Sequence, residues 1–148
     1  MLRDWKEYRA DDENFETIRA EVKTTAEELE VPKKIKMYLL LGFEEILENI
    51  INYAYDSEIR PVWLKLEKKS GKIILEFMDC GKKFNPLEND DERPAEKILQ
   101  NKRLGGYGLH FVKKFFQTIE YSYENFRGHN ANHLTLGINL NEKVGERT

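Results

Sequence analysis

The chain has 148 residues, of which 40% are hydrophobic and 34% are charged, so residues 1–148 are expected to form a single domain with a sizeable core. The formal net charge of −3 and the lack of a basic block interleaved with aromatic residues argue against direct nucleic-acid binding. The lone cysteine excludes an internal disulfide, and no apolar run approaches the ~18 residues of a membrane span, so a cytoplasmic location without membrane contact is expected.

The first part of the chain predicts a short strand and two helices. Leu2, Trp5 and Tyr8 indicate the strand. Residues 11–30 carry apolar side chains at helical spacing until Pro32 interrupts the pattern. The strongest helical pattern covers residues 35–55, where a broad apolar face is formed by Leu39, Phe43, Ile46, Leu47, Ile50 and Ala54.

The rest of the chain predicts mainly strands. Residues 62–67 and 72–78 read as a hairpin with a turn at 68–71, and residues 119–124 and 133–140 as a second pair with a turn at 127–130. Between the pairs lies a long polar segment, residues 82–103, with one short helix at 95–100, and a stretch of this kind is often a functional loop or lid. A glycine cluster at 105–108 then opens a helix that runs to about residue 117. The predicted fold is α+β, a two-layer sandwich with helices on one face of a mixed, largely antiparallel sheet.

Three polar residues share one face of the second predicted helix. Glu45, Asn49 and Asn52 stand at i, i+4 and i+7. A carboxylate one turn from an amide oxygen suits Mg²⁺, which takes oxygen ligands, and Glu45 could instead deprotonate an attacking hydroxyl. Because Glu44 and Glu48 flank this stripe, the alternative is that the whole arc is the solvent-exposed side of an amphipathic helix.

Asp79 and Gly81 follow the strand predicted over residues 72–78. A carboxylate at a strand end can accept a hydrogen bond from the amino group of adenine, and it would disfavour guanine, which has a carbonyl at that position. Gly81 would permit a close backbone approach or a positive φ angle. The alternative is an ordinary turn that leaves the strand.

The glycine cluster precedes a helix, where backbone N–H groups and the helix N-terminus favour the negative charge of phosphates. Gly105, Gly106 and Gly108 are its glycines, and Arg103 just upstream could add a charge contact. The segment is neither a P-loop, because Gly-x-x-x-x-Gly-Lys-Ser/Thr is missing, nor a dinucleotide-binding fingerprint, because no strand directly precedes it.

The order and spacing of these elements resemble the GHKL ATPase superfamily, and more narrowly its anti-sigma-factor serine/threonine kinases. The resemblance extends from about residue 10 to 140. The segments that carry it are Glu45-Ile-Leu-Glu-Asn49-Ile-Ile-Asn-Tyr-Ala-Tyr55, Asp79-Cys-Gly-Lys-Lys-Phe-Asn-Pro86, Leu104-Gly-Gly-Tyr-Gly-Leu-His-Phe-Val-Lys-Lys114 and Asn132-His-Leu-Thr-Leu136.

This resemblance implies a Bergerat-type ATP-binding fold and a set of residue roles. Glu45 would be the general base that activates a serine or threonine hydroxyl, and Asn49 would ligate Mg²⁺. Asp79, supported by Gly81, would bind the adenine amino group, and Thr135 would lie near the adenine pocket. The remaining expected ATP contacts are Asn52, Arg103, Gly105, Gly106, Gly108 and Leu109.

Three functions follow as hypotheses. The first is an ATP-dependent kinase that phosphorylates a small anti-sigma-factor antagonist protein and binds a regulatory partner such as a sigma factor, with a homodimer as a further implication of the resemblance. The second is a nucleotide-gated module that sequesters its partner without turnover. The third is an α/β interaction domain that binds no nucleotide. It stays open because a fold alone does not establish a function, which has to be argued from the residues of a site.

Overall fold

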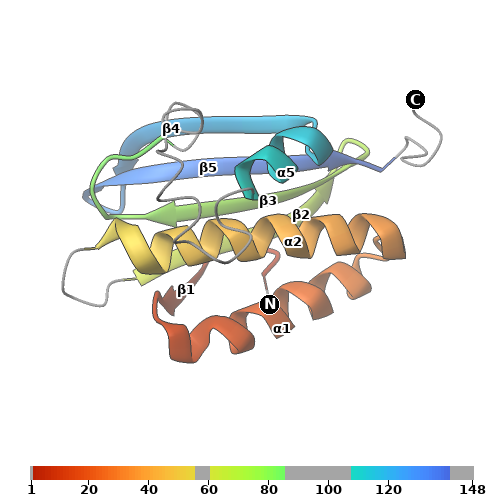
Figure 1. Ribbon diagram of the computed structural model, residues 1–148, viewed down its shortest axis with the longest axis horizontal. Helices are drawn as coiled ribbons and strands as arrows, with labels where there is room; N and C mark the ends of the chain where they lie inside the picture. The colour runs from red at the N-terminus through yellow and green to blue at the C-terminus, as the bar shows by residue number, and fades with distance from the viewer. Residues whose placement is uncertain (1, 56–60, 86–107, 141–148) are drawn as a thin grey trace.

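The computed structural model of the protein describes residues 2–55, 61–85 and 108–140. Within these ranges, two helices follow the first strand, and another comes in chain order between the first and second long hairpins (Figure 1). In chain order the elements are β1 (Lys6–Arg9), the 3₁₀ turn η1 (Asp12–Asn14), α1 (Phe15–Glu28), α2 (Lys33–Asn49), the π-helical turn η2 (Ile50–Ala54), β2 (Pro61–Lys69), β3 (Lys72–Asp79), α5 (Gly108–Phe115), β4 (Thr118–Phe126) and β5 (His129–Asn139).

The strands form one sheet in the order β1-β2-β3-β5-β4, and all four described pairings are antiparallel. The three helices α1, α2 and α5 cover one face of this sheet (Figure 1). The predicted two-layer α+β fold with a largely antiparallel sheet is therefore confirmed. Among the described helices, none has both the length and the apolar composition that crossing a membrane requires.

The core lies between the sheet and the helices because alternate strand residues are apolar. Leu64, Leu75 and Phe77 point from β2 and β3 toward Phe43 and Leu47 of α2, and all five are at most 1% exposed. Burial of side chains of this size contributes roughly 1.5–3 kcal/mol each. The apolar residues at helical spacing in α2 and the alternate apolar residues of the strands are therefore buried against each other.

Both long hairpins close with two-residue turns whose central residues have positive φ angles. Ser70 and Gly71 have φ of 54° and 75°, and Arg127 and Gly128 have φ of 54° and 87°. Two left-handed residues in succession match the twist of the flanking strands. The turns lie where the sequence predicted them.

The helix predicted over residues 35–55 is not uniform. It begins earlier, directly after Pro32, and its α-helical part ends at Asn49, after which residues 50–54 form the π-helical turn η2. A π-helical turn is wider than an α-helical turn, and such turns occur frequently at functional sites. The wider turn changes which side chains after Asn49 face the sheet.

Candidate functional site

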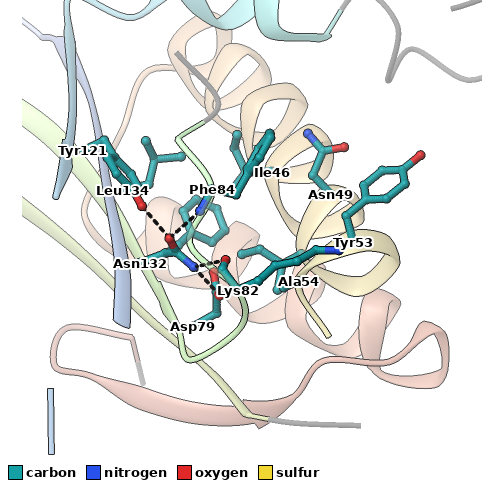
Figure 2. Close-up of a pocket in the computed structure, with 12 residues that line it drawn as sticks. Ile46, Asn49, Tyr53, Ala54, Asp79, Lys82, Phe84, Tyr121, Asn132 and Leu134 are labelled. Carbon is teal, nitrogen blue, oxygen red and sulfur yellow. Dashed lines mark hydrogen bonds between the residues drawn. The ribbon is translucent and has the colours of Figure 1, made fainter. Parts of the chain in front are cut away.

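A pocket of about 580 Å³, counted with the open space at its mouth, is lined by residues of the end of α2, of η2, of the end of β3 and of the neighbouring parts of β4 and β5 (Figure 2). Apolar side chains form most of the wall. The lining residues are Ile46, Asn49, Ile50, Tyr53, Ala54, Phe77, Asp79, Lys82, Phe84, Tyr121, Asn132 and Leu134.

Asp79 is the buried carboxylate of this pocket. It is 6% exposed, and its Oδ1 accepts hydrogen bonds from the Gly81 backbone N–H at 2.9 Å and from Asn132 Nδ2 at 3.0 Å. Its Oδ2 accepts none from any residue that the structure describes. Burial raises the pKa of Asp79, and the hydrogen bonds from Asn132 and Gly81 act against that rise. The site therefore offers one carboxylate oxygen to the amino group of a ligand.

Gly81 is required by a close backbone approach and not by a positive φ angle. A Cβ atom at this position would lie 2.2 Å from the carbonyl oxygen of Ala54, at the end of η2. The same carbonyl accepts a hydrogen bond of 3.1 Å from the Lys82 N–H. The loop after β3 is thereby held against the end of η2, and the Gly81 N–H is held in place for Asp79.

Asn132 is a site residue that the sequence did not reveal. It is 7% exposed on β5, it lines the pocket, and it pairs directly with Asp79 in the β3–β5 register. It lies in the segment Asn132-His-Leu-Thr-Leu136, in which the motif resemblance places Thr135, not Asn132, near the adenine pocket. Only the register of the two strands shows which position faces Asp79.

Glu45 and Asn49 lie one helical turn apart and are in contact. Asn49 Nδ2 donates to Glu45 Oε2 at 3.0 Å, and Glu45 is only 4% exposed. Glu44 instead accepts a hydrogen bond of 2.8 Å from Arg19 of α1. The alternative of a solvent-exposed arc is therefore wrong for Glu45, and of the two adjacent glutamates only Glu45 contacts Asn49.

The geometry of Asn49 fits a magnesium ligand. Because its amide nitrogen donates to Glu45, its amide oxygen is the atom left for a ligand in the pocket. The described residues include no group of three His, Cys, Asp or Glu side chains that could hold a metal by themselves. Mg²⁺ commonly combines one or two protein oxygens with phosphate oxygens and water, so an ion shared with a nucleotide is compatible with Asn49.

The expectation that Asn52 shares the face of Glu45 and Asn49 is wrong. Asn52 is exposed and is not part of the pocket lining, whereas Tyr53 is. The reason is η2, whose wider turn shifts the i, i+4, i+7 pattern after residue 49.

The expected phosphate contacts are described only in part. Gly108 is the first residue of α5, as the predicted helix start requires, and Leu109 follows within the same helix. Arg103, Gly105 and Gly106 lie outside the described residues, as does the predicted helix at 95–100.

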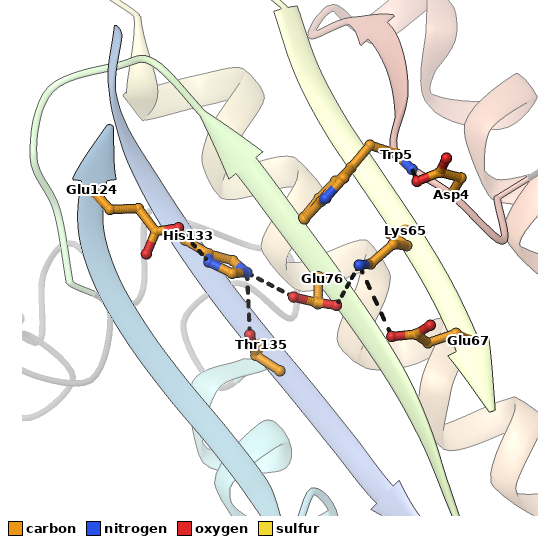
Figure 3. A network of polar contacts seen from close by, with 8 residues as sticks. All are labelled: Asp4, Trp5, Lys65, Glu67, Glu76, Glu124, His133 and Thr135. Atoms are coloured by element: carbon orange, nitrogen blue, oxygen red, sulfur yellow. Dashed lines mark hydrogen bonds and ion pairs between the residues drawn. The ribbon is translucent and has the colours of Figure 1, made fainter. Parts of the chain in front are cut away.

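The position predicted for Thr135, near the adenine pocket, is also wrong. Along β5 the side chains of Asn132 and Leu134 face the pocket, and alternation places Thr135 on the opposite face of the sheet. There its hydroxyl lies 3.4 Å from His133 Nε2 (Figure 3). His133 also contacts Glu76 Oε1 at 2.8 Å and Glu124 Oε1 at 3.3 Å.

This His133–Glu76 pair predicts a pH-dependent contribution to stability. The hydrogen bond between the two raises the pKa of His133 above 6.5 and lowers the pKa of Glu76 below 4.5. The contribution is present between these two pKa values. It is lost when the pH rises through the raised pKa of His133 or falls through the lowered pKa of Glu76.

In urea unfolding, His133→Gln should lower the free energy of unfolding by roughly 1 kcal/mol between the two pKa values, and by less in alkali. His129→Gln, an exposed histidine of the same strand, is the matched control and should show no such profile. A difference between wild type and His133→Gln that is the same at every pH would contradict the ionic role.

Comparisons with known proteins identify the family of the chain and proteins of similar fold. The chain matches the profile of the histidine kinase-like ATPase domain over residues 8–137. In fold it is similar to a chain in the crystal structure of the SiaB–SiaC complex from Pseudomonas aeruginosa, with a TM-score of 0.61, 13% identity, and coverage of 93% of this chain and 90% of that chain. It is also similar to the Acinetobacter baumannii histidine kinase AdeS, with a TM-score of 0.51, 14% identity, and coverage of 96% and 70%. None of the curated proteins matches it in sequence. Because the family match covers most of the chain, the chain belongs to the histidine kinase-like ATPase domain family.

Proposed function

We propose that the protein binds ATP with Mg²⁺ in this pocket and transfers the γ-phosphate to a serine or threonine of a small anti-sigma-factor antagonist protein in the cytoplasm. The observation that carries the proposal is that one apolar pocket joins the buried carboxylate of Asp79 to the amide oxygen of Asn49. The first group suits an adenine amino group, and the second suits a magnesium ion on the phosphates.

Each residue has a separate role in this proposal. Asp79 Oδ2 accepts a hydrogen bond from the base, and Asn49 holds the metal, which would neutralise charge on the phosphates during transfer. Glu45 removes the proton from the attacking hydroxyl as the new oxygen–phosphorus bond forms and ADP leaves. Gly105, Gly106 and Gly108 would supply backbone N–H groups to the phosphates, and Arg103, just upstream in the sequence, would add a charge contact.

The partner is proposed to be a protein. One structure of similar fold is a complex of two proteins, SiaB and SiaC, which supports a protein partner for this fold. The narrower proposal of an anti-sigma-factor antagonist, with a sigma factor as a second partner and a homodimer as the assembly, rests on the motif resemblance.

A second candidate function is a nucleotide-gated binding module without turnover. It is favoured by the burial of Glu45, which is 4% exposed and does not line the pocket, so a substrate hydroxyl would reach it only after a rearrangement. Nucleotide-dependent retention of a partner with no phosphoprotein formed would favour this module over the kinase.

The proposal is tested by calorimetry with ATP, ADP and GTP, each with and without Mg²⁺. Wild type should bind ATP and ADP but not GTP, and Mg²⁺ should strengthen ATP binding. Asn49→Leu should lose most of the Mg²⁺ effect, about tenfold in affinity if one ligand contact is worth ~1.4 kcal/mol.

Asn52→Leu is the matched control, because Asn52 lies on the same chain segment but outside the pocket, and its Mg²⁺ effect should equal that of wild type. If wild type binds no adenine nucleotide under any of these conditions, the proposed function is wrong.

A further inference from the structure

One buried amide connects the groups at the Asp79 end of the pocket. Asn132 Nδ2 donates to Asp79 Oδ1 at 3.0 Å and to the carbonyl oxygen of Lys82 at 2.9 Å (Figure 2). Its Oδ1 accepts hydrogen bonds from the Phe84 backbone N–H at 3.0 Å and from the Tyr121 hydroxyl. An amide side chain has two hydrogens to donate and two lone pairs to accept with, so Asn132 is fully occupied inside the protein. It therefore holds other groups in place and leaves ligand contact to them.

The orientation of this amide is set by the backbone. The Phe84 N–H can only donate, so it must face the amide oxygen, and the Lys82 carbonyl can only accept, so it must face the amide nitrogen. If the amide were reversed, two donors would face each other at the Phe84 N–H and two acceptors at the Lys82 carbonyl. Asn132 therefore presents an N–H, and not an oxygen, to Asp79.

This N–H determines how Asp79 meets a ligand. Together with the Gly81 N–H it places both donors on Oδ1, which fixes the plane of the carboxylate and leaves Oδ2 for the pocket. Both hydrogen bonds also favour the ionised form, whereas burial raises the pKa of Asp79 and favours the protonated form. An ionised carboxylate can only accept a hydrogen bond, whereas a protonated one could donate to a carbonyl.

We propose that Asn132 is the positioning residue that sets the preference of the pocket for a 6-amino purine over a 6-oxo purine, because it holds Asp79 Oδ1 and leaves Oδ2 to the base. The inference rests on the proposed function, since it concerns the base of the same nucleotide. It extends that function by assigning the selectivity to a pair of residues on neighbouring strands, of which only Asp79 would touch the ligand.

The test compares ATP with inosine triphosphate, which differs at the 6-position of the base. Wild type should prefer ATP by roughly 10- to 100-fold, the effect of one hydrogen bond to a charged group. In Asn132→Leu this ratio should fall to about twofold, with inosine triphosphate affinity nearly unchanged. Asn130→Leu makes the same substitution at an exposed position of β5 and should keep the wild-type ratio.

A purely structural role would weaken both nucleotides equally, so an unchanged ratio in folded Asn132→Leu overturns the inference. If that variant does not fold, Tyr121→Phe decides, because it deletes one hydrogen bond to Asn132 and keeps the aromatic ring. In Tyr121→Phe the preference for ATP over inosine triphosphate should fall by a smaller factor. A preference equal to that of wild type would overturn the inference. Wild type that binds no ATP overturns the proposed function itself, which is a different result from ATP binding with an unchanged ratio.

Discussion

Glu45→Gln should lower the turnover of ATP, followed as release or transfer of the γ-phosphate, by about 10²- to 10⁴-fold while ATP affinity stays close to that of wild type. Glutamine keeps an oxygen that can accept the 3.0 Å hydrogen bond from Asn49 Nδ2, so the orientation of Asn49, the proposed magnesium ligand, is preserved. What is lost is the negative charge that can take a proton from a hydroxyl. The substitution therefore separates the proposed role of Glu45 as a base from its contact with Asn49.

Glu44→Gln is the control for this experiment. Glu44 is the neighbour of Glu45 on α2, but it accepts its hydrogen bond from Arg19 of α1, outside the pocket. Transfer can be followed from radiolabelled ATP to an arrayed set of serine- and threonine-containing peptides, and Glu44→Gln should be within about twofold of wild type. Wild-type turnover in Glu45→Gln would remove Glu45 from the mechanism, and a lack of turnover in wild type itself would favour the nucleotide-gated binding module.

Asp79→Asn should weaken ATP binding by roughly 10- to 100-fold, because a hydrogen bond to a charged acceptor is replaced. The amide oxygen of the new side chain can accept from the Gly81 and Asn132 donors that now reach Oδ1, which turns its NH₂ group toward the pocket. Two amino groups would then face each other. A purine with a carbonyl at the 6-position should lose much less affinity than ATP.

The same substitution should not destabilise the ligand-free protein. Burial raises the pKa of Asp79 in the folded protein above its pKa in the unfolded chain. The free energy of unfolding therefore decreases as the pH rises from the unfolded pKa through the folded pKa, because the folded protein loses its proton less readily than the unfolded chain. A neutral asparagine removes this decrease, and the melting temperature at pH 7 should stay the same or increase. Asp12→Asn, at an exposed aspartate of η1, is the control and should change neither the ATP affinity nor the melting temperature. Unchanged ATP affinity in folded Asp79→Asn would show that Asp79 does not bind the base.

Local chemistry explains why so much of the fold was predictable from the sequence. Alternating apolar residues mark β2 and β3, apolar residues at helical spacing mark α1 and α2, and Ser70-Gly71 permits the two-residue turn between β2 and β3. Glu45 and Asn49 were found as a pair because a spacing of four residues in an α-helix brings two side chains together whatever the rest of the chain does. Gly81 was found because it follows Asp79 at the end of a strand.

Residues whose roles depend on pairing between distant segments could be decided only by the tertiary structure. Asn132 faces Asp79 because of the antiparallel register of β5 on β3, and a different parity would have brought Thr135 to the pocket face instead. Asn52 is displaced by the π-helical turn η2, whose end lies against the loop after β3. The sequence by itself determined the elements and the polar residues within each of them. Strand register and helix widening decided which of those residues meet, because both are set by packing between segments more than 20 residues apart in the chain.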